Sequence, residues 1–164
     1  MASTVAQNYE QLSFNGPELS QWRAQARTII ADQVATRQLT ALESGATCLF
    51  DIATGTVYTL PSPVIGMQFE FATTVTITSG AAKIVTNLAT EFIVGDLEQF
   101  IVGSATTSAV AANGTTHRSI NGNGSTTGGV IGDRIRLLAI SSTQWLVDGV
   151  KSCSGTLSTP FATS

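Results

Sequence analysis

The stretch from residue 112 to residue 150 constrains the fold most, because apolar and polar residues alternate there between glycine-rich turns. Ile120 precedes the turn cluster Asn-Gly-Asn-Gly at residues 121–124, and a second glycine pair stands at residues 128–129. Apolar and charged residues then interleave up to a polar break at residues 141–144, which leads into Trp145. Alternation bounded by Gly, Asn and Ser clusters is typical of antiparallel strands with one buried face. The stretch therefore predicts an all-β core.

The same pattern continues through the rest of the chain from about residue 38. Met67, Phe69 and Phe71 are predicted to share one face of a strand, and residues 73–78 to continue as a strand with Val75 and Ile77 directed inward. Asp96, Asp133 and Asp148 each adjoin a glycine, which indicates turns. About ten short strands at spacings of about 8 to 12 residues favour a β-sandwich or jelly roll.

Three segments are predicted from the changes in pattern. Residues 1–37 form an N-terminal arm, in which Leu19, Trp22, Ala26, Ile29 and Ile30 recur at helical spacing and predict a short helix over residues 16–30. Its apolar face packs either on this chain's own core or on a neighbouring subunit, and the sequence does not decide between them. Residues 38–151 form the β-sandwich domain, and residues 152–164 form an extended tail with Phe161 as its anchor.

The scarcity of charge limits which partners the chain suits. Charged residues are 12% of the chain, against about 25% in a typical soluble protein. A surface that is poor in charge is suited to being covered by partner molecules. The net charge of −3 and the scattered Lys and Arg residues exclude a nucleic-acid interface; Arg134 and Arg136 share one strand face without forming a patch. No signal peptide and no membrane-spanning run are expected, which predicts synthesis in the cytoplasm.

The residues capable of metal binding or redox chemistry are few. Cys48 and Cys153 have no CxxC spacing and no nearby His, so no metal site and no cofactor are expected. The two cysteines either pair or stay as free buried thiols, and the general burial of cysteine favours free thiols.

No constellation of catalytic residues is predicted. His117 is the one histidine, and Ser119 and Asp133 accompany it without a GxSxG-like motif, so a structural, hydrogen-bonded His117 in a strand is favoured over a general base. Glu91, Asp96 and Glu98 are close in sequence, but a carboxylate pair for glycoside cleavage is disfavoured against turn chemistry. We therefore expect no enzyme and name no catalytic residue.

Glycine-rich and aromatic segments are the remaining candidates for binding elements. The glycine-rich run at residues 122–129 lacks the Gly-Lys-Ser/Thr of a phosphate loop, so a flexible hairpin loop is favoured. The Asn-Gly-Thr at residues 113–115 and the Asn-Gly-Ser at residues 123–125 match glycosylation sequons, but turns are favoured. A sugar platform is disfavoured because aromatic residues are only 7% of the chain and Trp145 is expected in the core.

Several strings carry a resemblance to a known class of proteins. They are the segment ESGATCLFD at residues 43–51, YTLPSP at 58–63, GMQFEF at 66–71, TSGAAKIVT at 78–86, HRSI at 117–120, TTGGVIGD at 126–133 and QW at 144–145. Across residues 38–150 the chain resembles tailed-bacteriophage virion structural proteins, which serve as head decoration (cement) proteins and as distal modules of tail spikes or fibres.

The resemblance implies a non-catalytic homotrimer that binds the major capsid protein on the outer surface of the virion head and stabilises the shell. The alternative that it leaves open is a receptor- or glycan-binding module of a tail fibre or spike, with a host-surface glycan as partner. No catalytic, cofactor-binding or metal-binding residue is carried over from it, and neither nucleic acid nor membrane is expected as a partner.

Overall fold

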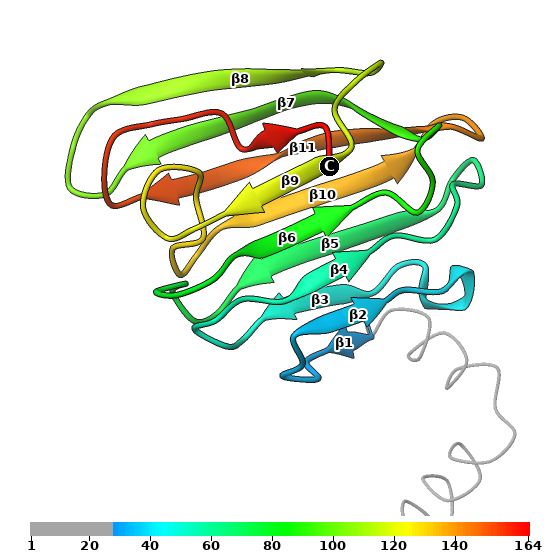
Figure 1. Ribbon diagram of the computed structural model, residues 1–164, viewed down its shortest axis with the longest axis horizontal. Helices are drawn as coiled ribbons and strands as arrows, with labels where there is room; N and C mark the ends of the chain where they lie inside the picture. Colours follow the sequence, from blue (N-terminus) through cyan, green and yellow to red (C-terminus); the bar gives the residue numbers. More distant parts are fainter. Residues whose placement is uncertain (1–27) are drawn as a thin grey trace, which may run out of the picture.

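The computed structural model describes residues 28–164, which form two β-sheets stacked face to face (Figure 1). The larger sheet contains, in spatial order, β1 (Ile29–Ile30), β3 (Thr47–Phe50), β5 (Gln68–Thr73), β10 (Arg134–Ala139), β11 (Gln144–Cys153), β7 (Phe92–Ile101) and β8 (Thr107–Asn113). The smaller sheet contains β12 (Phe161–Ala162), β9 (Ser119–Gly122), β6 (Ala82–Val85), β4 (Val57–Thr59) and β2 (Thr36–Gln38). One 3-10 turn, η1 (Ala41–Glu43), precedes β3. The fold is all-β, with the two layers of a β-sandwich, as the sequence predicts.

The first half of the chain winds between the two sheets instead of folding into hairpins. Strands β1, β3 and β5 lie parallel in the larger sheet, and β2, β4 and β6 lie parallel in the smaller one. The antiparallel pairing predicted from residues 112–150 does not extend to this half. It holds for β7 with β8 and for β10 with β11. A period of two residues reports only that one strand face is buried, which is true of both kinds of ladder.

The core lies between the sheets and is aromatic at its centre. Phe50, Tyr58 and Phe71 contact one another with ring centroids 5.3 to 6.1 Å apart, and Phe69 packs on Trp145 at 6.0 Å. All five side chains are buried. The predicted shared face of Phe69 and Phe71 and the predicted core position of Trp145 are thus confirmed.

Three local predictions are wrong. Residues 74–81 form a connection between β5 and β6 in which Ile77 is buried but Val75 is exposed. Asp96 and Asp148 lie inside the ten-residue strands β7 and β11 and not in turns. The glycine beside each has another use, because a Cβ on Gly95 would stand 2.2 Å from the carbonyl oxygen of Val147 on β11. Glycine at that position permits close approach of two strands.

Both flanks of the predicted domain contribute strands. The boundary placed between residues 37 and 38 falls within β2, and the one between residues 151 and 152 falls within β11. The helix predicted over residues 16–30 falls outside the described residues except at its end, where Ile29 and Ile30 form a strand. Phe161 of the tail is buried in β12, which pairs with β9, so its predicted role as an anchor is confirmed.

Strand directions divide the loops between the two ends of the sandwich. The connections at residues 39–46, 60–67, 86–91, 114–118 and 140–143 lie at one end, on the right in Figure 1. The connections at residues 31–35, 51–56, 74–81, 102–106, 123–133 and 154–160 lie at the other end. We call these the right end and the left end.

Candidate functional site

The residues considered for acid–base chemistry are not brought together. His117 precedes β9 at the right end, whereas Asp133 precedes β10 at the left end. Ser119 is fully buried, and its hydroxyl donates to the carbonyl oxygen of Ser164 at 3.0 Å. A Ser-His-Asp relay requires consecutive hydrogen bonds among its members. These three residues therefore form no such relay.

His117 is held by its own loop and by the tail. Its Nδ1 accepts a hydrogen bond from the backbone N–H of Asn113 at 3.2 Å, and its ring stacks on Phe161 at 5.6 Å. The predicted hydrogen bond is confirmed, but the predicted place in a strand is wrong, because His117 lies in the connection before β9. The imidazole joins the β8–β9 connection to the C-terminal strand.

A buried polar cluster lies at the left end beneath the glycine-rich loop. Asp133 accepts backbone N–H groups of Gly129 at 2.6 Å and of Ser152 at 2.5 Å. Burial raises the pKa of the Asp133 carboxyl, against the opposing charge of Lys151 and these hydrogen bonds. Burial likewise lowers the pKa of Lys151 to about 8, although Asp133 opposes the shift. Asp133 lies in the predicted turn, whose backbone it closes by donating its N–H to the carbonyl oxygen of Val130 at 3.2 Å, and its carboxylate is buried.

Cys153 completes this cluster as a protonated thiol. Its Sγ accepts a hydrogen bond from the backbone N–H of Gly128 at 3.1 Å. Burial raises the pKa of the thiol, which removes the thiolate that nucleophilic chemistry requires. Cys48 is also buried, and burial raises its pKa to about 12. The prediction of two free buried cysteines is confirmed, and the alternative disulfide is not formed.

The glycine-rich run is an ordered turn packed on this cluster. Gly124, Gly128 and Gly129 are buried, and the N–H of Gly124 donates to the carbonyl oxygen of Gly128 at 2.6 Å. A Cβ on Gly128 would stand 2.1 Å from Cε of Lys151. The loop closes over the buried amine instead of cradling a phosphate.

The two sequon-like segments fold as turns of the same kind, which confirms their prediction as turns. The Oδ1 atoms of Asn113 and Asn123 each accept N–H groups from the residues two and three positions ahead, at 2.8 to 3.0 Å. The glycine that follows each asparagine has φ of 72° or 75°. An asparagine acceptor followed by a glycine at positive φ is a regular turn motif.

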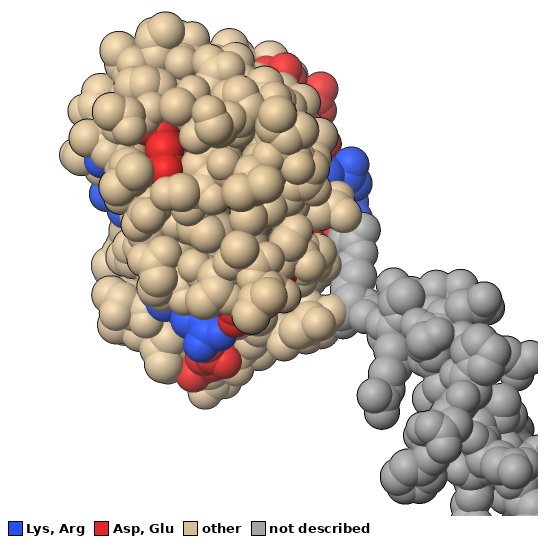
Figure 2. Space-filling model, turned by 90° about the vertical axis from the view of Figure 1, so that its right-hand side faces the viewer, with Lys and Arg blue, Asp and Glu red and all other residues tan. Residues whose placement is uncertain are grey.

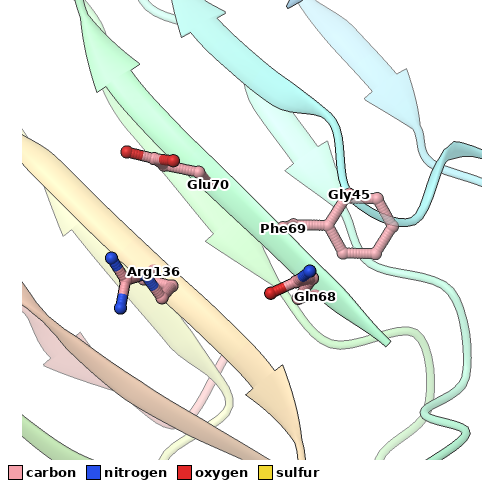
Figure 3. A pocket seen from close by; sticks show the side chains of 5 residues that line it. All are labelled: Gly45, Gln68, Phe69, Glu70 and Arg136. Carbon is pink, nitrogen blue, oxygen red and sulfur yellow. The ribbon is translucent and has the colours of Figure 1, made fainter. Parts of the chain in front are cut away.

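Charged side chains gather on the outer face of the larger sheet. Arg136 on β10 stands in register with Glu70 on β5 and with Asp148 on β11, to which its guanidinium lies 4.0 Å away. Figure 3 shows Glu70 and Gln68 of β5 beside Arg136 of β10, around a hollow of about 20 Å³. A wider groove of about 220 Å³ adjoins it and is also lined by Arg134. The predicted shared face of Arg134 and Arg136 is thus confirmed.

The right end carries the largest concentration of exposed apolar side chains. They belong to four separate loops: Leu42 (97% exposed), Val64, Ile65 (73% exposed), Leu88 and Ile140. Figure 2 shows this end mostly free of Lys, Arg, Asp and Glu, with one acidic patch within its upper part and further charged side chains at its lower edge and rims. We call these five side chains the end surface. Exposed apolar side chains gathered at one end of a domain make that end a candidate interaction site.

The acidic residues of the right end hold the end surface in position. Glu43 accepts the backbone N–H and hydroxyl of Thr40 at 2.7 and 2.9 Å, and it pairs with the guanidinium of Arg37. Burial raises the pKa of Glu43, but these hydrogen bonds and Arg37 outweigh it and lower the pKa below its ordinary value. The carboxylate fixes η1, and η1 presents Leu42 to solvent.

Glu91 has the same role in the neighbouring loop. It is buried, and its Oε2 accepts the backbone N–H groups of Asn87 and Leu88 at 3.0 and 3.1 Å. Its predicted proximity to Asp96 and Glu98 therefore does not bear on its function. Because the Glu91 carboxylate binds the backbone of its own loop, it is buried. The same hydrogen bonds fix the loop in the conformation that directs Leu88 outward.

The loop between β4 and β5 is anchored through its prolines. Pro61 and Pro63 are buried, whereas Val64 and Ile65 protrude. The N–H of Met67 donates to the carbonyl oxygen of Val64 at 2.9 Å, which closes the turn. The end surface is thus presented by hydrogen-bonded turns and proline anchors, which lowers the entropy that a partner must remove on binding.

Sequence reasoning missed this end surface, because it is assembled from loops. Leu42 and Leu88 stand beside small and polar residues, Ile140 ends the apolar run of the preceding strand, and Val64-Ile65 is an apolar pair. The usable signal lay in two of the four loops, where an acidic residue follows at the spacing that lets it bind its own backbone, as in Thr40 to Glu43.

Within residues 28–164, no group of three or more His, Cys, Asp and Glu side chains converges as a metal site. The same residues contain no helix long and apolar enough to cross a membrane. No protein-family model, curated protein or solved structure matches the chain.

Proposed function

We propose that the protein is a bacteriophage head decoration protein that attaches to the outer capsid surface through its end surface and stabilises the shell. The observation that carries the proposal is the end surface, in which four loops expose apolar side chains and two of these loops are fixed by carboxylates, Glu43 and Glu91, that accept their own backbone N–H groups. The resemblance of residues 38–150 to phage virion proteins supports the class of partner, which is the major capsid protein.

The mechanism is clamping by non-covalent contacts. A shell filled with packaged DNA is strained where its subunits meet, and a decoration protein that bridges a junction adds interface area there. Interfaces of standard size bury about 1,600 Å² in total. Attachment as a trimer, as the resemblance implies, links three such contacts and raises the avidity for the shell.

The test compares purified heads that lack the protein with heads to which it is added back. Bound protein should raise the temperature at which DNA is released, as followed by dye fluorescence during heating. Equal release temperatures at full occupancy would contradict a cementing role.

A matched pair of variants assigns the attachment to the right end. Ile65→Asp places a charge in the end surface, and Ile131→Asp places the same charge on an isoleucine of similar exposure at the left end. Burying an unpaired carboxylate is costly, so Ile65→Asp should abolish head binding while Ile131→Asp retains it. Both side chains are exposed, so both variants should unfold at the wild-type temperature. Equal binding by the two variants would exclude the end surface.

A receptor- or glycan-binding module remains the second candidate, and the groove on the outer face of the larger sheet favours it. Arg134, Arg136 and Asp148 supply donors and acceptors around about 220 Å³, which suits the hydroxyl groups of a saccharide. Binding of the isolated protein to host cells, lost in Arg136→Ala and kept in Ile65→Asp, would select this function. Host-cell binding that Arg136→Ala leaves unchanged would exclude the groove.

A further inference from the structure

Among the strands of residues 28–164, β8 lies at one edge of the larger sheet and pairs with β7 alone (Figure 1). It is seven residues long, whereas the strands at the other three sheet edges, β1, β2 and β12, contain two or three residues. Long edge strands present unpaired N–H and C=O groups that can pair with another chain. Natural proteins usually protect such edges, so an unprotected one is informative.

The ladder between β7 and β8 fixes which groups are unpaired. The N–H of Ile101 donates to Thr106 at 3.1 Å, and the N–H of Gly114 donates to Ile93 at 3.0 Å. Hydrogen-bonded pairs alternate in an antiparallel ladder. Ser108, Val110 and Ala112 therefore direct their backbone groups toward β7, and the four residues Thr107, Ala109, Ala111 and Asn113 direct theirs away from it.

A side-chain contact supports this assignment. The N–H of Asn113 points away from β7 and donates to Nδ1 of His117. No residue among 28–164 provides such a partner for the N–H groups of Thr107, Ala109 and Ala111. Three consecutive outward positions of β8 are thus available to another strand.

None of the usual protective features is present on β8. No charged residue occurs between Glu98 and His117, and the strand contains no proline. Its register with β7 is continuous from Thr107 to Asn113, so no bulge turns the edge away. The side chains at the outward positions are Thr, Ala and Ala, which leave the backbone accessible.

We propose that β8 pairs antiparallel with β8 of a second copy about a two-fold axis at Ala109. In this register Ala109 faces Ala109 of the second copy and Thr107 faces Ala111, so all three outward positions form hydrogen-bonded pairs. Three pairs with two bonds each make about six hydrogen bonds. The inference rests on the backbone geometry of β8 and not on the proposed function.

The arrangement of side chains favours a second copy as the occupant. The three outward positions carry only Thr, Ala and Ala, so no bulky side chain meets another. The nearest charges, Asp96 and Glu98, lie one strand back on β7. On opposite copies they would be three strand spacings apart, about 14 Å, which exceeds the Debye length of about 8 Å in physiological salt. Like charges therefore do not oppose the pairing.

Sedimentation velocity of the full chain over a wide concentration range tests the proposal. The wild type should form assemblies with an even number of copies, either dimers or, if trimers form through another face, hexamers. Ala109→Pro removes an N–H that makes no bond within the chain, and it deletes two of the six intersubunit bonds. Its self-association should weaken by about ten- to a hundredfold. Ala109→Ser keeps the N–H and should associate like the wild type.

Amide hydrogen exchange provides a second measurement that does not depend on a variant. The N–H groups of Thr107, Ala109 and Ala111 should exchange more slowly as protein concentration rises, whereas those of Ser108 and Val110 should not change. A monomer or trimer that Ala109→Pro leaves unaltered, with exchange at Thr107, Ala109 and Ala111 independent of concentration, would overturn the proposal. Slowing of these three amides only when capsids are added to a monomeric protein would assign the edge to another chain, and would also overturn it.

Discussion

Two left-end glycines, one in the loop at residues 102–106 and one in the loop at residues 123–133, allow the cost of a steric clash to be measured separately from the cost of a backbone conformation. Gly103 and Gly124 both have φ of 75°, in the left-handed region that glycine adopts at little cost. A Cβ on Gly103 would meet nothing within 4 Å, whereas a Cβ on Gly124 would stand 1.9 Å from the carbonyl oxygen of Ile77. Alanine at the two positions therefore shares the conformational cost and differs in the clash.

The expected magnitudes follow from these contacts. Gly103→Ala should lower the free energy of unfolding by about 1 to 2 kcal/mol, the cost of a left-handed alanine. Gly124→Ala should lose about 1 to 3 kcal/mol more, because relief of the clash must move a backbone group. That group belongs to Ile77, whose N–H donates to Gly129 at 2.8 Å, so the neighbouring hydrogen bond is strained as well.

Urea denaturation followed by the fluorescence of the buried Trp145 measures the difference. With a slope of about 2 kcal/mol per molar urea, an extra loss of 2 kcal/mol moves the midpoint of Gly124→Ala about 1 M below that of Gly103→Ala. The change in unfolded-chain entropy from Gly to Ala is the same in both variants and cancels. Coincident midpoints would show that the loop yields freely around residue 124, and would refute the argument that it is fixed by Ile77.

Three further predictions concern buried or turn-forming side chains. Tyr58→Phe removes the hydroxyl that donates to the carbonyl oxygen of Leu49 at 2.8 Å, and should lower the free energy of unfolding by about 1 kcal/mol in urea titrations; an unchanged midpoint would mean that water replaces the bond. Asn123→Ala removes an acceptor for three backbone N–H groups and should cost about 1 to 2 kcal/mol, whereas Asn123→Asp keeps the acceptor and should cost less; equal losses in thermal unfolding would contradict this role. Burial lowers the pKa of Lys151 from 10.5 to about 8, so between these pH values the unfolded chain binds the proton that the folded chain has released. The stability of the wild type relative to Lys151→Met should therefore rise with pH across this window, by up to about 3 kcal/mol, and parallel stability curves would contradict it.

The sequence predicted the fold class because the core obeys a simple periodicity. Phe69 and Phe71 on β5 and Ile135 and Leu137 on β10 alternate with residues directed outward, and all four are buried. Alternation reports which face is buried but not which strand lies alongside. The parallel winding of β1 to β6 therefore could not be predicted from it.

The wrong predictions of strand ends arose from glycines that were interpreted as turn residues. Asp96 and Asp148 were expected in turns because each adjoins a glycine, but Gly95 sits where β7 approaches β11 closely. A glycine needed for a turn and one needed for close packing are identical in a sequence. Only the neighbouring strand, distant along the chain, distinguishes them.

The candidate surfaces depend on groups far apart in the chain and were not predicted. Leu42 and Ile140 of the end surface are separated by almost a hundred residues, and neither belongs to a periodic pattern. Asp133 and Lys151 were likewise not recognised as one cluster, because they meet through the hairpin of β10 and β11. Such contacts arise from topology, which local propensity does not encode.

Strands β1 to β6 alternate between the two sheets. The repeating unit of this half of the molecule is therefore one turn of the winding, made of two consecutive strands, one in each sheet. β3 and β4 form one such turn, bonded to the turn before it and to the turn after it by parallel ladders of the same kind. A complete turn inserted or deleted here would leave the ladders on either side intact and would only lengthen or shorten the sandwich, as in solenoid proteins. Related chains of different length are therefore expected to differ by whole turns in this region, and not within β7 to β12, where the parallel winding ends and β7, β9, β10 and β11 each lie between two partner strands.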